Sequence, residues 1–345
     1  MPESKSLPDW AYVEKPCSRG VIKVEPRDFF VEEMLGFELS GAGEHLYLLI
    51  EKWGLNTQEL VKVLSRQLSI HPRHISYAGL KDKQAVTRQW ISLLIPGDIE
   101  LVDFQSNAAD LSGFRVLEAQ RHSSKLKRGA HQGNHFEIVV RDISENETLE
   151  AAIERIRAQG VPNYFGEQRF GRGGKNIDKA RALFSGKQKV DRQLRGLYLS
   201  AARSFLFNEV LSERVHQEAW ASILPGEVLM LDGSNSFFKS DALDTKLSER
   251  LDVFDIHPSA PLWGKGNLAS SGDAFRLESE IIAQYPDLSC GLEAFGLRQQ
   301  RRATRLIPTG LTCTWTEQTS LKIGFELSKG NFATTVLREL FTIGA

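Results

Sequence analysis

One charged interruption between two apolar segments constrains the fold of this chain more than any other stretch. Residues 75–78 form a short apolar segment typical of a β-strand, and Gly79 ends it. A charged turn follows at residues 81–83, and residues 89–95 have the apolar composition of a second, buried strand. The sequence therefore predicts two strands joined by a turn that presents Asp82 at the end of the first strand.

Asp82 lies between two cations and is the candidate reactive group. Lys81 and Lys83 flank it directly, and Arg88 follows nearby. Positive neighbours favour the charged form of a carboxylate, which suits a nucleophile or a base rather than an acid. The alternative is a solvated turn in which Asp82 caps the following segment, because aspartates are common in loops.

A strand and a helix upstream are predicted to support this turn. Residues 44–50 are apolar at nearly every position, as in a central strand covered on both faces. Asn56 and Glu59 have capping-box spacing, and leucines recur every four positions along the helix that they begin. We therefore expect this helix to pack on the sheet and to fix the strand that leads to Asp82.

The composition is that of an ordinary globular protein. The chain has 345 residues, enough for two domains, with 41% hydrophobic and 25% charged residues. No apolar run has the length of a membrane span, and the N-terminus lacks a signal-peptide core, so we expect a cytoplasmic protein. The three cysteines lie far apart, without the spacing of a metal site or a disulfide framework.

Basic residues gather in three segments, at 121–128, 169–175 and 298–305. The net charge of −1 does not point to a nucleic-acid partner, but a neutral total can hide a basic face. The first segment has no apolar period and is predicted to be an exposed loop suited to phosphates. The stretch 161–175 mixes arginines with aromatic residues, which suits an RNA backbone groove. The alternative is that each segment is a separate solvated surface.

Five segments, spread over nearly the whole chain, carry recognisable patterns. They read I-K-x-x-P-x-D-F-x-V-x-E at 22–33, A-G-L-K-D-K-x-A-x-T-x-Q at 78–89, G-N-x-F at 133–136, P-N-Y-F-G-x-Q-R-F-G at 162–171 and G-x-F-A-T-x-x-L-R-E-L at 330–340. Together they resemble the signature motifs of the TruD family of tRNA pseudouridine synthases. The sequence departs from the family pattern at His131, where the family has a leucine.

The resemblance implies roles for six residues. Asp82 would be the catalytic aspartate, and five residues would lie at the target uridine: Lys23, Phe29, Asn134, Phe136 and Phe332. Lys23 would pair with Asp82 or with a phosphate, and Asn134 would form a hydrogen bond with the edge of the base. The residues alone leave another interpretation open, in which the three phenylalanines are core residues of the sheet and of the closing helix.

The resemblance also implies an α+β fold in two parts. A pseudouridine-synthase-type catalytic domain with a mixed, largely antiparallel sheet would comprise residues 1–160 and 304–345, and an inserted α/β TRUD domain would comprise residues 161–303. The apolar spacing predicts a long amphipathic helix at 195–215, and the last motif is predicted to be helical from 331 to 340.

The implied reaction is the isomerisation of uridine to pseudouridine in tRNA, and the family's usual target is uridine 13 in the D arm. No cofactor and no metal would be needed, because uracil is itself the leaving group and is recaptured. The expected partner is tRNA, with no membrane and no obligate protein partner. The candidates for contact with the RNA backbone are Lys125, Lys127, Arg128, Arg169 and Arg172.

Two other classes of function remain open from the residues. An RNA-binding protein without catalytic activity would keep the basic segments and the aromatic residues but would not need Asp82. A nucleoside hydrolase would use Asp82 to cut a glycosidic bond in a small molecule. It would need neither the basic loop at 121–128 nor an inserted domain.

Overall fold

The structure is a computed structural model that describes residues 7–95, 97, 113–144, 147–240 and 244–344. It divides into two compact units, a sheet unit and a helical unit. The sheet unit comprises Cys17–Thr148, Pro308–Gly330 and Phe341–Ala345. The helical unit comprises Met1–Pro16, Leu149–Ile307 and Asn331–Leu340.

The predicted domain boundaries and this division by contact use different criteria. Residues 1–16, 149–160 and 331–340 belong to the helical unit by contact. The sequence assigns the same residues to the catalytic domain, which it predicts at 1–160 and 304–345. The boundaries of a catalytic and an inserted domain therefore stay a prediction.

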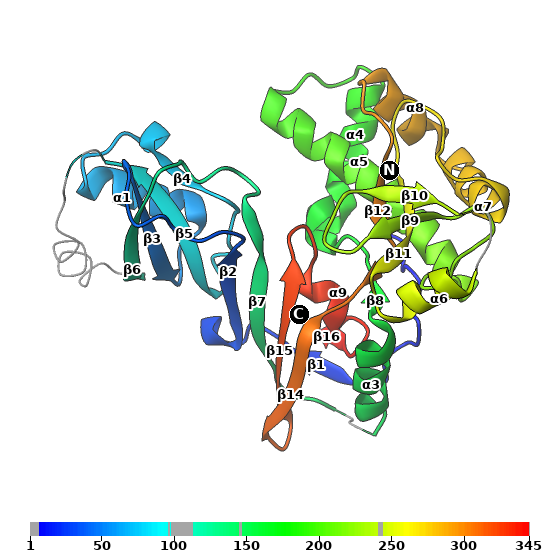
Figure 1. The fold of residues 1–345 in the computed structure, drawn as a ribbon, viewed down its shortest axis with the longest axis horizontal. Helices are drawn as coiled ribbons and strands as arrows, with labels where there is room; N and C mark the ends of the chain where they lie inside the picture. The colour runs from blue at the N-terminus through cyan, green and yellow to red at the C-terminus, as the bar shows by residue number, and fades with distance from the viewer. Residues whose placement is uncertain (1–6, 96, 98–112, 145–146, 241–243, 345) are drawn as a thin grey trace. The chain divides into compact units, whose positions relative to one another are not determined.

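The sheet unit contains a mixed, largely antiparallel sheet, in which eight strands pair among the described residues (Figure 1). They follow the order β14, β15, β7, β2, β5, β3 and β6, and β4 pairs with β5. Their bounds are β2 Phe29–Leu35, β3 His45–Lys52, β4 Ile75–Tyr77, β5 Val86–Leu94, β6 Phe114–His122, β7 His131–Val140, β14 Thr309–Glu317 and β15 Ser320–Ser328. β2 and β5 run parallel, whereas the other neighbours run antiparallel. The mixed α+β character predicted for the chain is confirmed.

Strand β3 is buried on both faces, as its apolar sequence predicts. One of its faces shares a hydrophobic core with helix α1 (Thr57–Gln67), to which the helix contributes Leu60 and Leu64. On the other face Tyr47 packs against Trp90 of β5, with ring centroids 6.4 Å apart. Full burial of one leucine stabilises the fold by roughly 1.5–3 kcal/mol, so this packing holds α1 firmly on the sheet.

Helix α1 begins with the predicted capping box. The side chain of Asn56 accepts a hydrogen bond from the Glu59 N–H at 2.8 Å, and the Glu59 carboxylate accepts one from the Asn56 N–H at 2.8 Å. A side-chain cap of this kind stabilises a helix by about 1 kcal/mol. It fixes the first helical residue, Thr57, which contacts the turn that carries Asp82.

The remaining strands of the sheet unit are short. Strand β1 (Arg19–Val21) pairs in parallel with β16 (Thr342–Gly344), and the 3₁₀ helix η1 (Pro26–Asp28) leads into β2. A second 3₁₀ helix, η2 (Pro72–His74), precedes β4.

The helical unit surrounds the long helix α5 (Arg192–His216), whose existence and type agree with the prediction at 195–215. Its other helices are α3 Leu149–Gln159, α4 Lys175–Phe184, α6 Thr245–Asp252, α7 Gly272–Ala283, α8 Pro286–Ala294 and α9 Ala333–Leu337. Its strands are β8 Val161–Pro162, β9 Val228–Leu231, β10 Phe237–Lys239, β11 Ile256–Leu262, β12 Gln300–Ala303 and β13 Arg305–Leu306. The short 3₁₀ helices η3 (Glu167–Phe170) and η4 (Arg172–Gly174) precede α4. No helix in the described part of the chain is long and apolar enough to cross a membrane.

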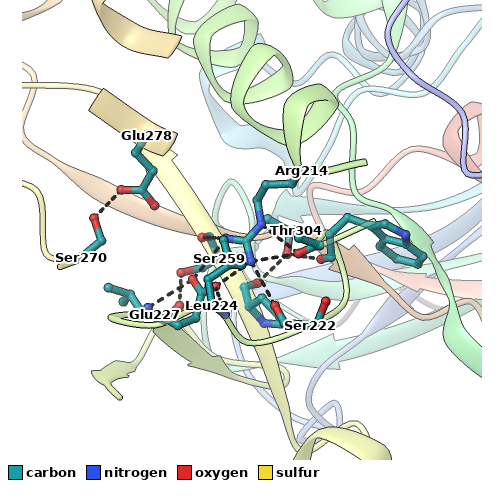
Figure 2. A network of polar contacts seen from close by, with 12 residues as sticks. Arg214, Ser222, Leu224, Glu227, Ser259, Ser270, Glu278 and Thr304 are labelled. Carbon is teal, nitrogen blue, oxygen red and sulfur yellow. Dashed lines mark hydrogen bonds and ion pairs between the residues drawn. The ribbon is translucent and has the colours of Figure 1, made fainter. Parts of the chain in front are cut away.

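A buried polar network joins α5 to the neighbouring strands of the helical unit (Figure 2). The side chains of Arg214 and Glu227 are fully buried, and their charged atoms lie 2.6 Å apart. Arg214 also donates hydrogen bonds to the carbonyl oxygens of Ala219 and Ser222. Removing one partner of such a pair costs about 3–5 kcal/mol, because it leaves a buried charge without compensation.

The basic segment 298–305 differs from the expected basic surface. Arg301 is buried and pairs with Glu278 at 2.7 Å. Arg305 is also buried, and it donates to the carbonyl oxygens of Leu251 and Ile256. Both arginines therefore stabilise the interior of the helical unit and are not available to an external phosphate.

Two predicted elements have different bounds in the structure. Helix α9 covers only Ala333–Leu337 of the predicted 331–340, because Phe332 is an extended N-cap residue and the chain after Leu337 continues in tighter turns, with hydrogen bonds from the Glu339 N–H to the Val336 carbonyl and from the Leu340 N–H to the Leu337 carbonyl. Strand β6 extends to His122, so the exposed loop begins at residue 123 rather than 121.

Candidate active site

Asp82 lies in the turn between β4 and β5, and its carboxylate is held by two groups. The Lys23 ammonium lies 2.5 Å from Asp82 Oδ2, and the Gln84 N–H donates to Oδ1 at 3.2 Å. The Asp82 side chain remains 48% exposed, so a substrate can reach it. Lys23 thus satisfies part of the carboxylate without covering it.

Several interactions determine the charge of Asp82. Partial burial by itself raises the pKa of this carboxyl group. The hydrogen bond from Lys23, the backbone N–H groups of Gln84 and Lys83 and the charge of Lys23 outweigh burial, so the pKa lies below its ordinary value. The carboxylate is therefore ionised at neutral pH, as expected, but through Lys23 and backbone N–H groups rather than through the ammonium groups of Lys81 and Lys83, which pair with Glu33 and Glu59.

Lys23 has an unusual backbone conformation. Its φ of 60° falls in the left-handed region, which costs a residue other than glycine about 1–3 kcal/mol. The side chain is fixed by Asp82 and by Phe29, whose ring centroid lies 4.6 Å from the ammonium. The next residues are anchored by buried Asp28, whose carboxylate accepts from Arg141 at 2.7 and 3.0 Å. This segment therefore holds Lys23 in place before any substrate arrives.

Phe29 and Phe136 lie on neighbouring strands, β2 and β7. Their rings pack edge to face with centroids 6.4 Å apart, and Phe136 also stacks on Phe325 at 5.5 Å. Each of the two rings is only 7% exposed. Both therefore contribute to the packing of the sheet, and their contact with a base stays a prediction.

Lys81 points inward, although its neighbour Asp82 points outward. Its ammonium lies 3.4 Å from the fully buried carboxylate of Glu33 and donates a hydrogen bond to Asn134 Oδ1. Burial lowers the pKa of Lys81 and raises the pKa of Glu33, and the attraction between them opposes both changes. The role of Lys81 is thus to tie the turn to β2 and β7.

Lys52 is a functional candidate that the sequence reasoning missed. This residue ends β3 with no exposed surface, and its ammonium donates to the carbonyl oxygens of Leu55 at 2.7 Å and Asp82 at 2.9 Å. Burial lowers the pKa of Lys52 to about 8, although the charge of Asp82 raises it. The sequence did contain a sign of this buried lysine, because Lys52 closely follows a segment that is apolar on both faces of the predicted strand.

Two buried polar side chains fix the rest of the turn. Thr57 Oγ1 accepts from the Lys81 N–H at 2.8 Å and donates to Gln89 Oε1 at 2.9 Å. Gln89 in turn donates to the Gly79 carbonyl oxygen at 2.6 Å. The backbone from Gly79 to Asp82 is therefore held by side chains of α1, β3 and β5 together.

The predicted phosphate-binding loop follows β6 in the same unit. Lys125, Lys127 and Arg128 are exposed, whereas Leu126 between them is buried and anchors the loop. Arg128 lies over the ring of Tyr77, 3.6 Å from its centroid, and none of the three cations forms an ion pair with a described carboxylate. Their charges are therefore available to an external anion.

The other three candidate residues, Phe332, Arg169 and Arg172, belong to the helical unit. Phe332 is half-buried at the start of α9, with its ring 6.0 Å from that of Phe165. The Arg169 guanidinium lies 5.7 Å from the Phe332 ring and donates to Ser200 Oγ at 3.0 Å, and burial lowers its pKa. Arg172 is exposed. Asp82, Lys23, Phe29, Asn134 and Phe136 belong to the sheet unit.

The sheet unit thus presents one ionised, half-exposed carboxylate on a rigid turn. Such a group is equipped to act as a nucleophile or a base. Among the residues that the structure describes, no group of three or more His, Cys, Asp or Glu side chains is arranged to hold a metal ion.

Comparison with known proteins identifies the family. The family model described as tRNA pseudouridine synthase D (TruD) matches residues 9–180 and 174–340. A protein of Hydrogenovibrio crunogenus named tRNA pseudouridine synthase D is 42% identical over 346 residues, covering 99% of this chain and 99% of its own length. A protein of Methylococcus capsulatus with the same name is 45% identical over 332 residues, covering 96% of this chain and 93% of its own length.

The fold agrees with that of a solved structure. A crystal structure from Methanosarcina mazei, of a candidate tRNA pseudouridine synthase D (TruD), superposes with a TM-score of 0.76 at 22% identity. The match covers 99% of this chain and 98% of the other. On the family model and the near full-length relatives, the chain belongs to the family of tRNA pseudouridine synthase D (TruD).

Proposed function

We propose that this protein converts uridine 13 in the D arm of tRNA to pseudouridine and that Asp82 starts the reaction. The observation that carries the proposal is the ionised, half-exposed carboxylate of Asp82, held 2.5 Å from Lys23 in a turn with the sequence of the family motif. Membership of the family and the names of the relatives support the same reaction.

The reaction exchanges one bond of the base for another. The bond between N1 of uracil and C1′ of the ribose breaks, the uracil turns, and C5 bonds to C1′. The hydrogen on C5 leaves as a proton and N1 gains one, so the product is an isomer of the substrate. Asp82 acts by attack on the ring or the sugar, or by a deprotonation that gives a glycal, and each route uses its ionised form.

The target base must leave its stack to reach Asp82. Phe29, Phe136 and Phe332 would receive it, and Asn134 would hydrogen-bond to its edge. Within the sheet unit, the position of Phe29 beside Lys23 and its contact with Phe136 support the roles proposed for Phe29 and Phe136. The exposed cations of the loop, Lys125, Lys127 and Arg128, would hold phosphates of the tRNA, together with Arg169 and Arg172.

Incubation of unmodified tRNA with the protein tests the proposal directly. Pseudouridine is mapped by nucleotide, and release of tritium from uridine labelled at C5 reports turnover, because C5 exchanges its hydrogen for the sugar. We expect one pseudouridine, at position 13, and no tritium release from tRNA that carries cytidine there. Pseudouridine at another position would refute the target, whereas no pseudouridine in any tRNA would refute the reaction.

A further inference from the structure

A short stretch of the helical unit concentrates positive charge. Residues 175–195 comprise α4, the connection to α5 and the first turn of α5, and we call them the basic arm (Figure 1). They contain seven lysines and arginines and two aspartates, a net charge of +5. Because the whole chain carries −1, the rest of it carries −6. The charge of the basic arm is therefore opposite to that of the remaining protein.

Both aspartates of the basic arm have local roles. Asp178 lies 3.9 Å from Arg181, which also pairs with Asp287 at 2.7 Å. Asp191 caps α5 by accepting from the Leu194 N–H at 2.9 Å. The structure gives no ion pair with a described carboxylate for the other exposed cations of the basic arm, which are Lys175, Lys179, Lys187, Lys189, Arg192 and Arg195.

Cations of α4 and of α5 come together near Tyr198. Lys175 and Lys179 are four residues apart on α4 and share one side of it. The Lys179 ammonium lies 5.6 Å from the ring of Tyr198 on α5, and Arg195 precedes Tyr198 by three residues, on the same side of that helix. The two rows of cations therefore meet where α4 packs against α5.

In the free protein, neighbouring cations of the basic arm repel one another. Like charges four residues apart on a helix destabilise it by roughly 0.2–0.5 kcal/mol per pair, and Lys175 and Lys179 form such a pair. A polyanion laid across both rows would remove this repulsion.

We infer that the basic arm is a further RNA-binding surface, which holds the phosphate backbone of the tRNA substrate. It begins three residues after Arg172 and extends that candidate contact along α4 and α5. The identity of the RNA rests on the proposed function, but the surface itself is defined by charge and geometry. It contributes to binding and not to the chemical step.

The test compares two variants with the same change of charge. In the arm variant Lys175, Lys179, Arg192 and Arg195 become glutamine, which favours helix and keeps α4 and α5 intact. In the control variant four exposed cations of the helical unit outside the basic arm become glutamine: Lys239, Lys246, Lys265 and Arg276. Affinity for tRNA is measured over a range of salt concentrations, and single-turnover rate is measured at saturating tRNA.

The arm variant should bind tRNA more weakly than the control. The slope of log affinity against log salt should become shallower by about 0.7–0.9 for each phosphate that the variant no longer binds, while the saturated rate stays unchanged. Equal affinities and slopes in the two variants would overturn the inference, because bulk charge would then explain the effect. Binding does not require turnover, so an inactive wild-type protein would refute the proposed function and leave this inference open to the same measurement.

Discussion

The ammonium of Lys23 and the carboxylate of Asp82 lie 2.5 Å apart although 59 positions separate them in the chain. The parallel pairing of β2 with β5 makes this contact possible, because it aligns Phe30 with Val86 and so brings the two preceding segments to the same edge of the sheet. The candidate catalytic group is therefore a product of the fold, and its ionisation depends on a residue that the local sequence does not contain.

Substitution of Asp82 by asparagine should abolish pseudouridine formation. The side chains have nearly the same shape, but the amide has no charge and cannot serve as nucleophile or base, so the rate should fall by roughly 10²–10⁴-fold or more. Tritium release from C5-labelled tRNA measures this rate, and thermal melting checks the fold. Turnover near that of the wild type would remove Asp82 from the site and favour a silent RNA-binding protein.

Substitution of Lys23 by methionine should shift the pH dependence of catalysis. Lys23 lowers the pKa of Asp82, so its removal should raise that pKa. As the pH is lowered, the variant should therefore lose the reactive carboxylate earlier, at a higher pH than the wild type. The acidic limb of kcat/KM against pH should move to higher pH. Lys83→Met is a matched control, because the Lys83 ammonium pairs with Glu59 at 3.3 Å instead. An unchanged acidic limb in Lys23→Met would show that Lys23 does not control the charge of Asp82.

Much of the sheet unit could be predicted from local pattern. The capping box at Asn56, the strand buried on both faces and the polar turn at Asp82 each depend on residues close together in the sequence. Lys81 could not be assigned in this way, because its inward orientation depends on Glu33 and Asn134. From the local sequence alone, every side chain of a charged turn is predicted to be exposed. In the structure the Asp82 side chain is half-exposed, whereas the Lys81 side chain is buried.

Substitution of Lys52 by methionine should reduce kcat more than it changes KM for tRNA. The Asp82 carbonyl would lose its donor, and a displacement of about 1 Å at a reacting group costs roughly 10²-fold in rate. Steady-state kinetics separates the two constants. A rise in KM alone would assign Lys52 to RNA binding rather than to positioning.

The pH dependence of folding stability is a second test of the burial of Lys52. The pKa of Lys52 is about 8 in the folded protein and takes its ordinary value of 10.5 in the unfolded chain. Between these two pH values the unfolded chain therefore binds more protons than the folded protein. The stability contributed by this group should therefore rise with pH from about 8 to about 10.5 in the wild type. Denaturant unfolding across this range should show no such rise in Lys52→Met.

Substitution of Lys125 and Lys127 by alanine should weaken tRNA binding without slowing the chemical step. Both are exposed, so the salt slope should become shallower by about 0.7–0.9 for each phosphate that is no longer bound. Arg128 is left in place, because its contact with Tyr77 gives it a packing role as well. Lys62→Ala with Arg66→Ala on α1 makes the same change of charge in the same unit. Identical slopes in the two variants would mean that the loop is only a solvated surface.

The burial of Arg301 and Arg305 in the third basic segment shows where charge patterns alone fail. Arg301 and Arg305 look like surface cations in the sequence, but Glu278 and the carbonyl oxygens of distant residues satisfy them in the interior. Lys125 and Lys127, in the loop after β6, also stand in a basic segment of the sequence, but they are exposed. Only the position of the partners distinguishes the two cases, and a single sequence does not give that position.

A base-stacking role and a packing role of Phe332 lead to clearly different expected effects of its substitution. It is half-buried, packs against Phe165 and lies 5.7 Å from the Arg169 guanidinium. If its ring stacks on the flipped base, Phe332→Ala should lose roughly 1–3 kcal/mol of interaction, or about 5- to 150-fold in kcat/KM, with RNA bound. If it is only a packing residue, the loss should appear in folding stability. That loss should be smaller than the roughly 3–5 kcal/mol of a fully buried phenylalanine, because Phe332 is only half-buried.

Melting temperature and activity measured on the same samples separate these outcomes. Phe207→Ala is the packing control, because Phe207 is fully buried in the same hydrophobic core and should lose stability. Phe332→Tyr should retain activity, because the aromatic ring is kept and the half-buried site leaves the added hydroxyl within reach of water. We expect Phe332→Ala to lose activity per folded molecule with a smaller loss of melting temperature than Phe207→Ala. A large loss of melting temperature with unchanged activity per folded molecule would remove Phe332 from the candidate uridine contacts.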